Sequence, residues 1–193
     1  MPLRCLRVPG RHNVANALAA IAATRELDVP FAPIADALRA FRGVGRRFEK
    51  IGEENGILVI DDYAHHPTEI KATLSAAKAV YPGRRVIAVF QPHLFSRTKQ
   101  FTTEFAQALS LADQVILTDI YPAREQPMPG VTSDNIRFEA EKIGSKQFRY
   151  VGVKENALSA LREMATPGDV IITIGAGSIT HIKHQIVDIV KSL

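Results

Sequence analysis

Short apolar runs that alternate with helical segments constrain the fold of this chain more than any other feature. Val86–Phe90, Val115–Leu117 and Val170–Ile174 are almost entirely apolar, which is typical of strands that are buried on both faces. The stretches between these runs repeat their apolar residues every three or four positions, as helices do. Strict alternation of strand and helix predicts a parallel sheet that is covered by helices on both faces.

The chain begins differently, with two predicted helices and a hairpin. Residues 13–27 are Ala-rich with helical periodicity, and a second, shorter helix is expected at 33–41. Strands are then expected on either side of a turn at 53–56. The two hairpin strands are expected at 47–51 and 57–60. Helices and strands then alternate. The helices are expected at 67–81, 96–111, 133–143, 156–164 and 179–190, and the strands at 86–90, 114–118, 148–151 and 170–174.

The predicted fold class is therefore α/β, with a Rossmann-like, mostly parallel sheet, helices on both faces and an N-terminal β-hairpin. Two helices cannot bury a core on their own, because most helix stability in proteins comes from tertiary packing. We therefore expect residues 1–44 to be the last helices of a preceding domain, whose other parts lie outside this sequence. Residues 45–193 are expected to form the α/β domain.

Composition and charge exclude several classes of protein. No apolar run approaches the ~20 residues of a membrane-spanning helix, so no membrane location is expected. The only cysteine, Cys5, has no partner for an internal disulfide, which suits the cytoplasm. The net charge of +4 suits anionic small molecules, but the basic residues form no stripe, so we expect no nucleic-acid partner.

Polar side chains gather at two of the predicted strand ends. The segment AspAspTyrAlaHisHisPro at 61–67 follows one strand, and GlnProHisLeuPheSerArgThr at 91–98 follows the next. In open parallel sheets, ligands bind at the carboxyl ends of the strands. Two junctions that bring carboxylates, histidines, a tyrosine and an arginine to one crevice indicate a reaction site.

Each of these groups also has a structural alternative. Asp61 and Asp62 either hold a ribose hydroxyl or a hydrated cation, or simply begin a turn. His65 is a candidate donor to phosphate or carboxylate, whereas His66 is equally compatible with a position that only precedes a helix. Arg97, four residues after His93, either grips a carboxylate or phosphate or forms a surface ion pair with Glu104 or Asp113.

Two loops are ambiguous in the same way. GlyAlaGlySer at 175–178 either approaches a ligand through its backbone or lets a strand pack closely on a helix, and it is not a GxGxxG fingerprint. The segment at 120–125, with Arg124 and Glu125, is either a lid or an ordinary surface loop. The sequence contains no glycine-rich lysine loop that would cradle nucleotide phosphates.

Several motifs occur in a fixed order that resembles the C-terminal part of the Mur ligases. They are GlyArgHisAsnValAlaAsnAlaLeuAlaAla at 10–20, GlyArgArgPheGlu at 45–49, AspAspTyrAlaHisHisProThrGlu at 61–69, PheGlnProHis with ArgThr at 90–98, AspIleTyrProAlaArgGlu at 119–125 and GlyAlaGly at 175–177. The resemblance implies an ATP- and Mg²⁺-dependent ligase in peptidoglycan precursor synthesis, whose amino-acid domain is this chain. It implies UDP-N-acetylmuramate and L-alanine as substrates and an acyl phosphate as intermediate.

The resemblance also implies a role for individual residues. Mg²⁺ ligands are expected mainly in the central domain outside this chain, and none is assigned here. Arg46 remains an alternative to Arg47. The implied ATP-binding residues are His12, Asn13, Asn16, Arg47 and Asp62. The implied substrate-binding residues are Tyr63, His65, His93 and Arg97. The resemblance also implies that His65, His93 and Arg97 are catalytic.

Two departures and two rival functions stay open. Leu94 stands where many members have arginine, and Ser178 stands where an acidic residue is usual.

One rival is a sister activity that attaches a recycled tripeptide to UDP-N-acetylmuramate, but Gln91–His93 favours the alanine reaction. The other rival is a non-catalytic nucleotide-binding module, which the missing phosphate loop favours for this polypeptide taken alone.

Overall fold

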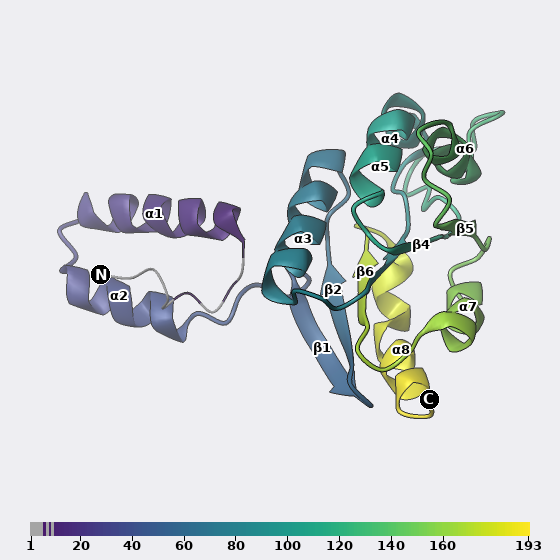
Figure 1. Cartoon of the computed structure of the whole chain (residues 1–193). Helices are drawn as coiled ribbons and strands as arrows, with labels where there is room; N and C mark the ends of the chain where they lie inside the picture. The colour runs from purple at the N-terminus through teal and green to yellow at the C-terminus, as the bar shows by residue number, and fades with distance from the viewer. Residues whose placement is uncertain (1–5, 7, 9) are drawn as a thin grey trace.

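The computed structural model contains a six-stranded sheet with helices on both sides (Figure 1). It describes residues 6, 8 and 10–193, except for the side chains of Arg11 and His12. The predicted ATP contact of His12 thus lies outside the described residues. The strands, in chain order, are β1 (Glu49–Glu54), β2 (Ile57–Asp62), β3 (Val86–Phe90), β4 (Gln114–Leu117), β5 (Phe148–Tyr150) and β6 (Val170–Ile174).

The helices confirm the predicted alternation. They are α1 (Arg11–Arg25), α2 (Phe31–Ala40), α3 (Pro67–Val80), α4 (Phe95–Gln100), α5 (Thr102–Leu109), α6 (Asp134–Lys142), α7 (Asn156–Met164) and α8 (Lys183–Val190), with a 3₁₀ segment, η1 (Ser178–Ile182), before the last.

The sheet is parallel except at one edge, as predicted. Its order is β1-β2-β6-β3-β4-β5, and only β1 runs antiparallel to its neighbour. The hairpin between β1 and β2 turns at Asn55 and Gly56, whose φ angles are 48° and 74°. Two consecutive positive φ angles form the tight turn that matches the twist of paired strands, and asparagine followed by glycine adopts them most readily.

Alternate residues of each strand enter two separate cores, one on each face of the sheet. In β3, Val86, Ala88 and Phe90 pack on the face that α3, α5 and α6 cover. Ile87 and Val89 point to the opposite face, which α7, η1 and α8 cover. All five residues are fully buried, which explains why these strands are apolar throughout.

Two predicted helices are wrong in detail. The helix expected at 96–111 is broken at Phe101, whose φ of −117° and ψ of 25° separate α4 from α5. The Phe101 ring packs edge-on against the His66 ring at 4.7 Å between centroids, so tertiary packing favours the break. His66 thereby takes its structural alternative. The helix expected at 179–190 opens as the 3₁₀ segment η1.

The helices α1 and α2 lie beside one another and away from the sheet (Figure 1). Among the described side chains of this pair and the turn between the helices, only Ala17 and Ile34 are buried, whereas Leu18, Leu27 and Phe31 are 55%, 76% and 48% exposed. The pair therefore contributes little buried apolar area, which is the source of most packing energy. None of the described helices is long and apolar enough to cross a membrane.

Candidate active site

The candidate site lies where β2, β6 and β3 end together. Strand β6 sits between the two strands whose ends carry the polar motifs. The backbone joins the three ends, because Gly175 N–H donates to Asp62 O and Gln91 N–H donates to Ile174 O, both at 3.0 Å. The two junctions therefore meet across the end of a third strand, at an edge where open α/β sheets bind ligands.

Aromatic and imidazole rings form a continuous wall at this edge. The rings of His65 and His93 lie 6.2 Å apart between centroids. Tyr63 packs edge-on against His65 at 5.3 Å, and Tyr121 stacks on His93 at 5.6 Å. The structure thus brings the three predicted ring residues together and adds Tyr121, which stands just beyond β4 and which the sequence analysis did not select.

Arg97 extends the wall from helix α4. Its Nη1 lies 3.4 Å from Nδ1 of His93, and no carboxylate of the described residues lies within 4.0 Å of its guanidinium. The alternative of a surface ion pair with Glu104 or Asp113 is wrong, because Arg97 forms neither pair within 4.0 Å among the described residues and Asp113 pairs with Lys78 instead. Arg97 therefore keeps its charge available for an anion.

The hydrogen-bond partners define the protonation of the two site histidines. An arginine only donates, so Nδ1 of His93 accepts from Arg97 and its proton is on Nε2. Burial lowers the pKa of His93, the charges of Arg97 and His65 lower it further, and Glu125 opposes them. Nδ1 of His65 lies 3.0 Å from the carbonyl oxygen of Tyr63 and therefore carries a hydrogen.

Glu69 connects this wall to the arginines, although the sequence analysis did not select it as a site residue. Its Oε2 accepts from the backbone N–H groups of His65 and His66 at 2.9 and 3.1 Å. Burial would raise its pKa, but these hydrogen bonds and the charges of His65 and Arg47 outweigh burial and lower it. Oε1 of Glu69 lies 4.0 Å from Arg47.

Arg46 and Arg47 are neighbours with different surroundings. The Arg46 guanidinium donates to the carbonyl oxygen of Gly175 at 2.6 Å and lies 3.4 Å from the buried carboxylate of Asp61. Arg47 is half exposed, and its one ion pair among the described residues is the distant contact with Glu69. Both guanidinium groups stand over the Tyr63 ring, at 4.7 and 5.4 Å. Arg46 thus anchors the fold, whereas Arg47 remains available to a ligand.

Replacing each arginine separately should expose this difference. Arg46→Ala is expected to lower the free energy of unfolding by about 2 kcal/mol, less than the roughly 3–5 kcal/mol of a broken buried pair because Lys183 still faces Asp61. Arg47→Ala should change it by less than about 0.5 kcal/mol, as for most surface residues. Urea unfolding of this chain measures both values, and equal losses would contradict the assignment.

Asp61 and Asp62 both support the local structure. The fully buried Asp61 accepts from the hydroxyls of Thr173 at 2.6 Å and Thr180 at 2.9 Å, so its role is structural, but inside strand β2 and not at the start of a turn. Asp62 accepts from the backbone N–H groups of Phe48 and Ala64, each at 2.8 Å. Burial raises the pKa of Asp62 although these hydrogen bonds lower it.

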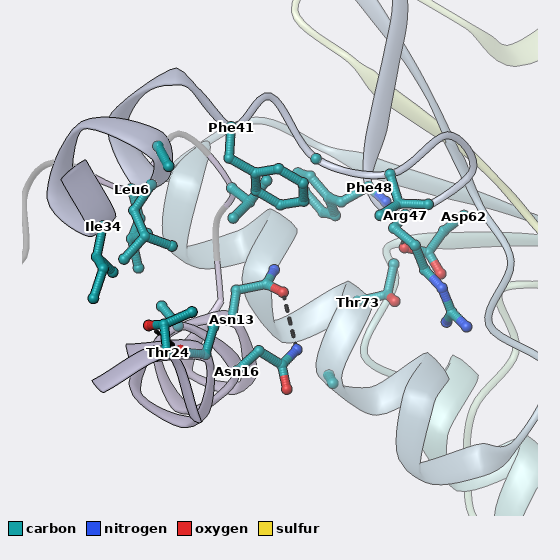
Figure 2. Close-up of a pocket in the computed structure, with 18 of the residues that line it drawn as sticks. Leu6, Asn13, Asn16, Thr24, Ile34, Phe41, Arg47, Phe48, Asp62 and Thr73 are labelled. Carbon is teal, nitrogen blue, oxygen red and sulfur yellow. Dashed lines mark hydrogen bonds between the residues drawn. The ribbon is translucent and has the colours of Figure 1, made fainter. Parts of the chain in front are cut away.

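A cavity of about 1000 Å³ separates the helical pair from the sheet domain. Figure 2 shows Asn13 and Asn16 on one side of it and Arg47 and Asp62 on the other. The Asn16 amide donates to Oδ1 of Asn13 at 3.4 Å. Four of the five residues that the family resemblance implies for ATP therefore line one space, with apolar side chains between them.

The glycine loop after β6 takes its packing alternative. A Cβ at Gly175 would lie 2.8 Å from Gln91 O, and one at Gly177 would lie 2.6 Å from Cγ of Tyr121. Real side chains do not fit at such distances. Ser178, in the usually acidic position, lies 3.4 Å from the Gln91 side chain. The glycines therefore let this loop pack under Gln91 and Tyr121.

Leu94 adopts an uncommon backbone conformation beside the wall. Its φ is 75°, a region that a bulky side chain rarely occupies. Its N–H donates to Tyr121 O at 2.9 Å, and its carbonyl oxygen accepts from the Thr98 hydroxyl at 2.8 Å. These contacts hold the turn that carries His93.

Within the described part of the chain, no group of three or more potential ligand side chains is placed to hold a metal ion.

Comparison with known proteins identifies a family. A family model described as "Mur ligase, glutamate ligase domain" matches residues 46–177. The chain is 50% identical to UDP-N-acetylmuramate–L-alanine ligase of Salinibacter ruber over 187 residues, which is 97% of this chain and 39% of that relative. The chain thus spans about two fifths of the length of this curated relative.

Solved structures have the same fold. UDP-N-acetylmuramate–alanine ligase of Thermotoga maritima superposes with a TM-score of 0.82 at 34% identity, over 97% of this chain and 39% of that one. A murein peptide ligase of Psychrobacter arcticus superposes with a TM-score of 0.69 at 32% identity, over 95% of this chain and 38% of that one. The similarity includes both the sheet domain and the helical pair, because it covers nearly the whole chain.

Proposed function

This chain belongs to the Mur ligase family, and from that premise we propose that it is the C-terminal part of an enzyme that joins L-alanine to UDP-N-acetylmuramate. The observation that carries the proposal is the wall of His65, His93 and Arg97, which lies close to a nucleotide-sized cavity. The relative from Salinibacter ruber, a UDP-N-acetylmuramate–L-alanine ligase by name, supports the same substrate. Such an enzyme acts in the cytoplasm.

The cavity fits the nucleoside end of ATP. The amides of Asn13 and Asn16 supply both donors and acceptors, which a purine edge needs, and Arg47 supplies a cation near the opposite side. Asp62 shapes this side through its backbone hydrogen bonds. ATP, with Mg²⁺ held mainly outside this chain, supplies the phosphoryl group that activates the muramate carboxylate.

The wall provides binding and charge neutralisation for the second substrate. Arg97 binds the carboxylate of L-alanine, because a guanidinium grips a carboxylate through two parallel hydrogen bonds. His93 remains neutral near pH 7 and keeps a hydrogen on Nε2, so it donates without adding repulsion toward the alanine ammonium group. Tyr63 and Tyr121 hold the two imidazoles in place. Rate enhancement then comes from orientation and electrostatics.

The choice of amine substrate tests this function against its nearest rival. In the full-length protein, kcat/KM for L-alanine should exceed that for a murein tripeptide by more than about 10-fold, since a site that is shaped for one small amino acid does not accommodate a longer peptide. The assay follows ATP-dependent phosphate release with each amine. A preference for the tripeptide would assign the chain to the rival ligase.

The purified 193-residue chain is expected to be inactive by itself. Its sequence holds no phosphate loop, so it cannot place the reacting phosphoryl group, although the cavity remains. Incubation with ATP, L-alanine and UDP-N-acetylmuramate should give no product above the enzyme-free control. The gene sequence upstream of Met1 supplies the second readout: a phosphate loop there favours the ligase, and its absence favours the non-catalytic module.

A further inference from the structure

Glu125 links a loop to the helix that carries Arg97. Its carboxylate accepts hydrogen bonds from both the backbone N–H of Ser96, at 2.9 Å, and the Ser96 hydroxyl. Ser96 is in the first turn of α4, where helix N–H groups have no partner inside the helix. The loop that begins at Tyr121 is therefore fastened to α4 at a point one residue before Arg97.

The same loop is fastened to the wall at its other end. Tyr121 N–H donates to Pro92 O at 2.8 Å, Leu94 N–H donates to Tyr121 O at 2.9 Å, and the Tyr121 ring stacks on His93. Two attachments, one at Tyr121 and one at Glu125, thus enclose the turn that carries His93. Movement of one attachment changes where this turn and α4 stand relative to each other.

The charge of Glu125 also reaches the wall. Ser96 and the nearby Arg97 lower the pKa of Glu125, which therefore stays ionised at neutral pH. Around His93, the titratable or charged groups that act on its pKa are Arg97, His65 and Glu125, and Glu125 alone raises it. Glu125 forms no ion pair within 4.0 Å among the described residues, so its carboxylate remains committed to Ser96.

We propose that Glu125 is a positioning residue that fastens the loop at 121–125 to helix α4 and thereby fixes Arg97 and His93 in the geometry that receives L-alanine. The functional part of this proposal rests on the proposed ligase activity. The structural part of the proposal, that Glu125 fastens the loop to α4 and acts on the wall, is tested in this chain alone. Because a displacement of about 1 Å at a reacting site can cost on the order of 100-fold in rate, even an indirect anchor has a measurable effect.

Three variants separate hydrogen bonding from charge. Glu125→Ala removes both, Glu125→Gln keeps an acceptor oxygen but removes the charge, and Ser96→Ala removes only the hydroxyl. Glu104→Gln is the matched control, because Glu104 is an exposed carboxylate in the first turn of the neighbouring helix α5. It should leave every measured quantity unchanged.

The first measurement follows the His93 pKa by NMR in this 193-residue chain. Glu125→Gln should lower it, because the negative charge that raises it is gone, while thermal unfolding stays within a few degrees of the parent. A surface carboxylate that neither fastens the loop nor acts on the wall would leave the His93 pKa unchanged in a folded variant. An unchanged pKa in both Glu125 variants would overturn the structural part of the proposal.

The second measurement uses the full-length enzyme. Glu125→Ala should raise KM for L-alanine on the order of 10-fold, with KM for ATP unchanged, and Glu125→Gln and Ser96→Ala should show smaller increases. An unaltered KM for L-alanine in Glu125→Ala would overturn the functional part. If the full-length protein does not use L-alanine at all, the proposed function fails, while the His93 titration still decides whether Glu125 acts on the wall.

Discussion

Amide protons of residues 13–40 will exchange on the order of 1,000-fold faster than those of β3 and β6 in this chain. Ala17 and Ile34 are the only buried side chains that the structure describes in the helical pair, so local opening of α1 and α2 exposes little apolar surface. The strands β3 and β6 lie in the middle of the sheet with every residue buried. Their amides exchange only when the whole domain unfolds.

Helix α3 is the matched control for this experiment. It has 14 residues against 15 in α1, but its Ile70, Leu74 and Ala77 are fully buried against the sheet. Hydrogen exchange read by mass spectrometry or NMR should give protection in α3 that approaches that of the strands. If α1 is as protected as α3, residues 1–44 are part of the same cooperative unit, and the predicted boundary near residue 44 is wrong.

The sequence predicts β3, β6 and the ends of α7 well because their signals are local, whereas the strand expected at 47–51 lies at Glu49–Glu54. Apolar runs mark β3 and β6 to the residue, since a strand buried on both faces admits few polar side chains. The break at Phe101 has no such local signal, because the ring that packs against Phe101 belongs to His66, which precedes helix α3 and is distant in the sequence. Strand order is likewise hidden, and nothing in β6 itself indicates that it lies between β2 and β3.

The candidate site is predicted in part, for the same physical reason. Residues at strand ends, such as His93, are recognisable because topology brings those ends together. Arg46 and Arg47 are adjacent and identical in chemistry, so only the fold distinguishes the anchor from the available cation. Glu69 and Tyr121 were missed because each stands where an ordinary role, a helix-dipole acid or a loop aromatic, explains it equally well.

Arg97→Ala in the full-length enzyme should lower kcat/KM for L-alanine by about 10- to 150-fold. The estimate follows from the roughly 1.5–3 kcal/mol of a charge-assisted hydrogen bond, at about 1.4 kcal/mol per factor of ten. Thermal stability should hardly change, because Arg97 approaches His93 at 3.4 Å and forms no ion pair with the described residues that the substitution would break. Arg149→Ala is the control, since it breaks a surface ion pair with Glu163 on the edge strand β5, away from the strands β2, β6 and β3 that carry the site.

Two further readouts distinguish a carboxylate grip from a general electrostatic effect of Arg97. Arg97→Lys should recover only part of the activity, because a point charge does not reproduce the planar fork of a guanidinium. In the 193-residue chain, Arg97→Ala should raise the His93 pKa, since the charge of Arg97 is one cause that lowers it. Steady-state kinetics at saturating ATP and UDP-N-acetylmuramate distinguish the two roles. If Arg97→Ala raises the His93 pKa but keeps the parental kcat/KM for L-alanine, Arg97 shifts the pKa of the histidine and does not bind the substrate.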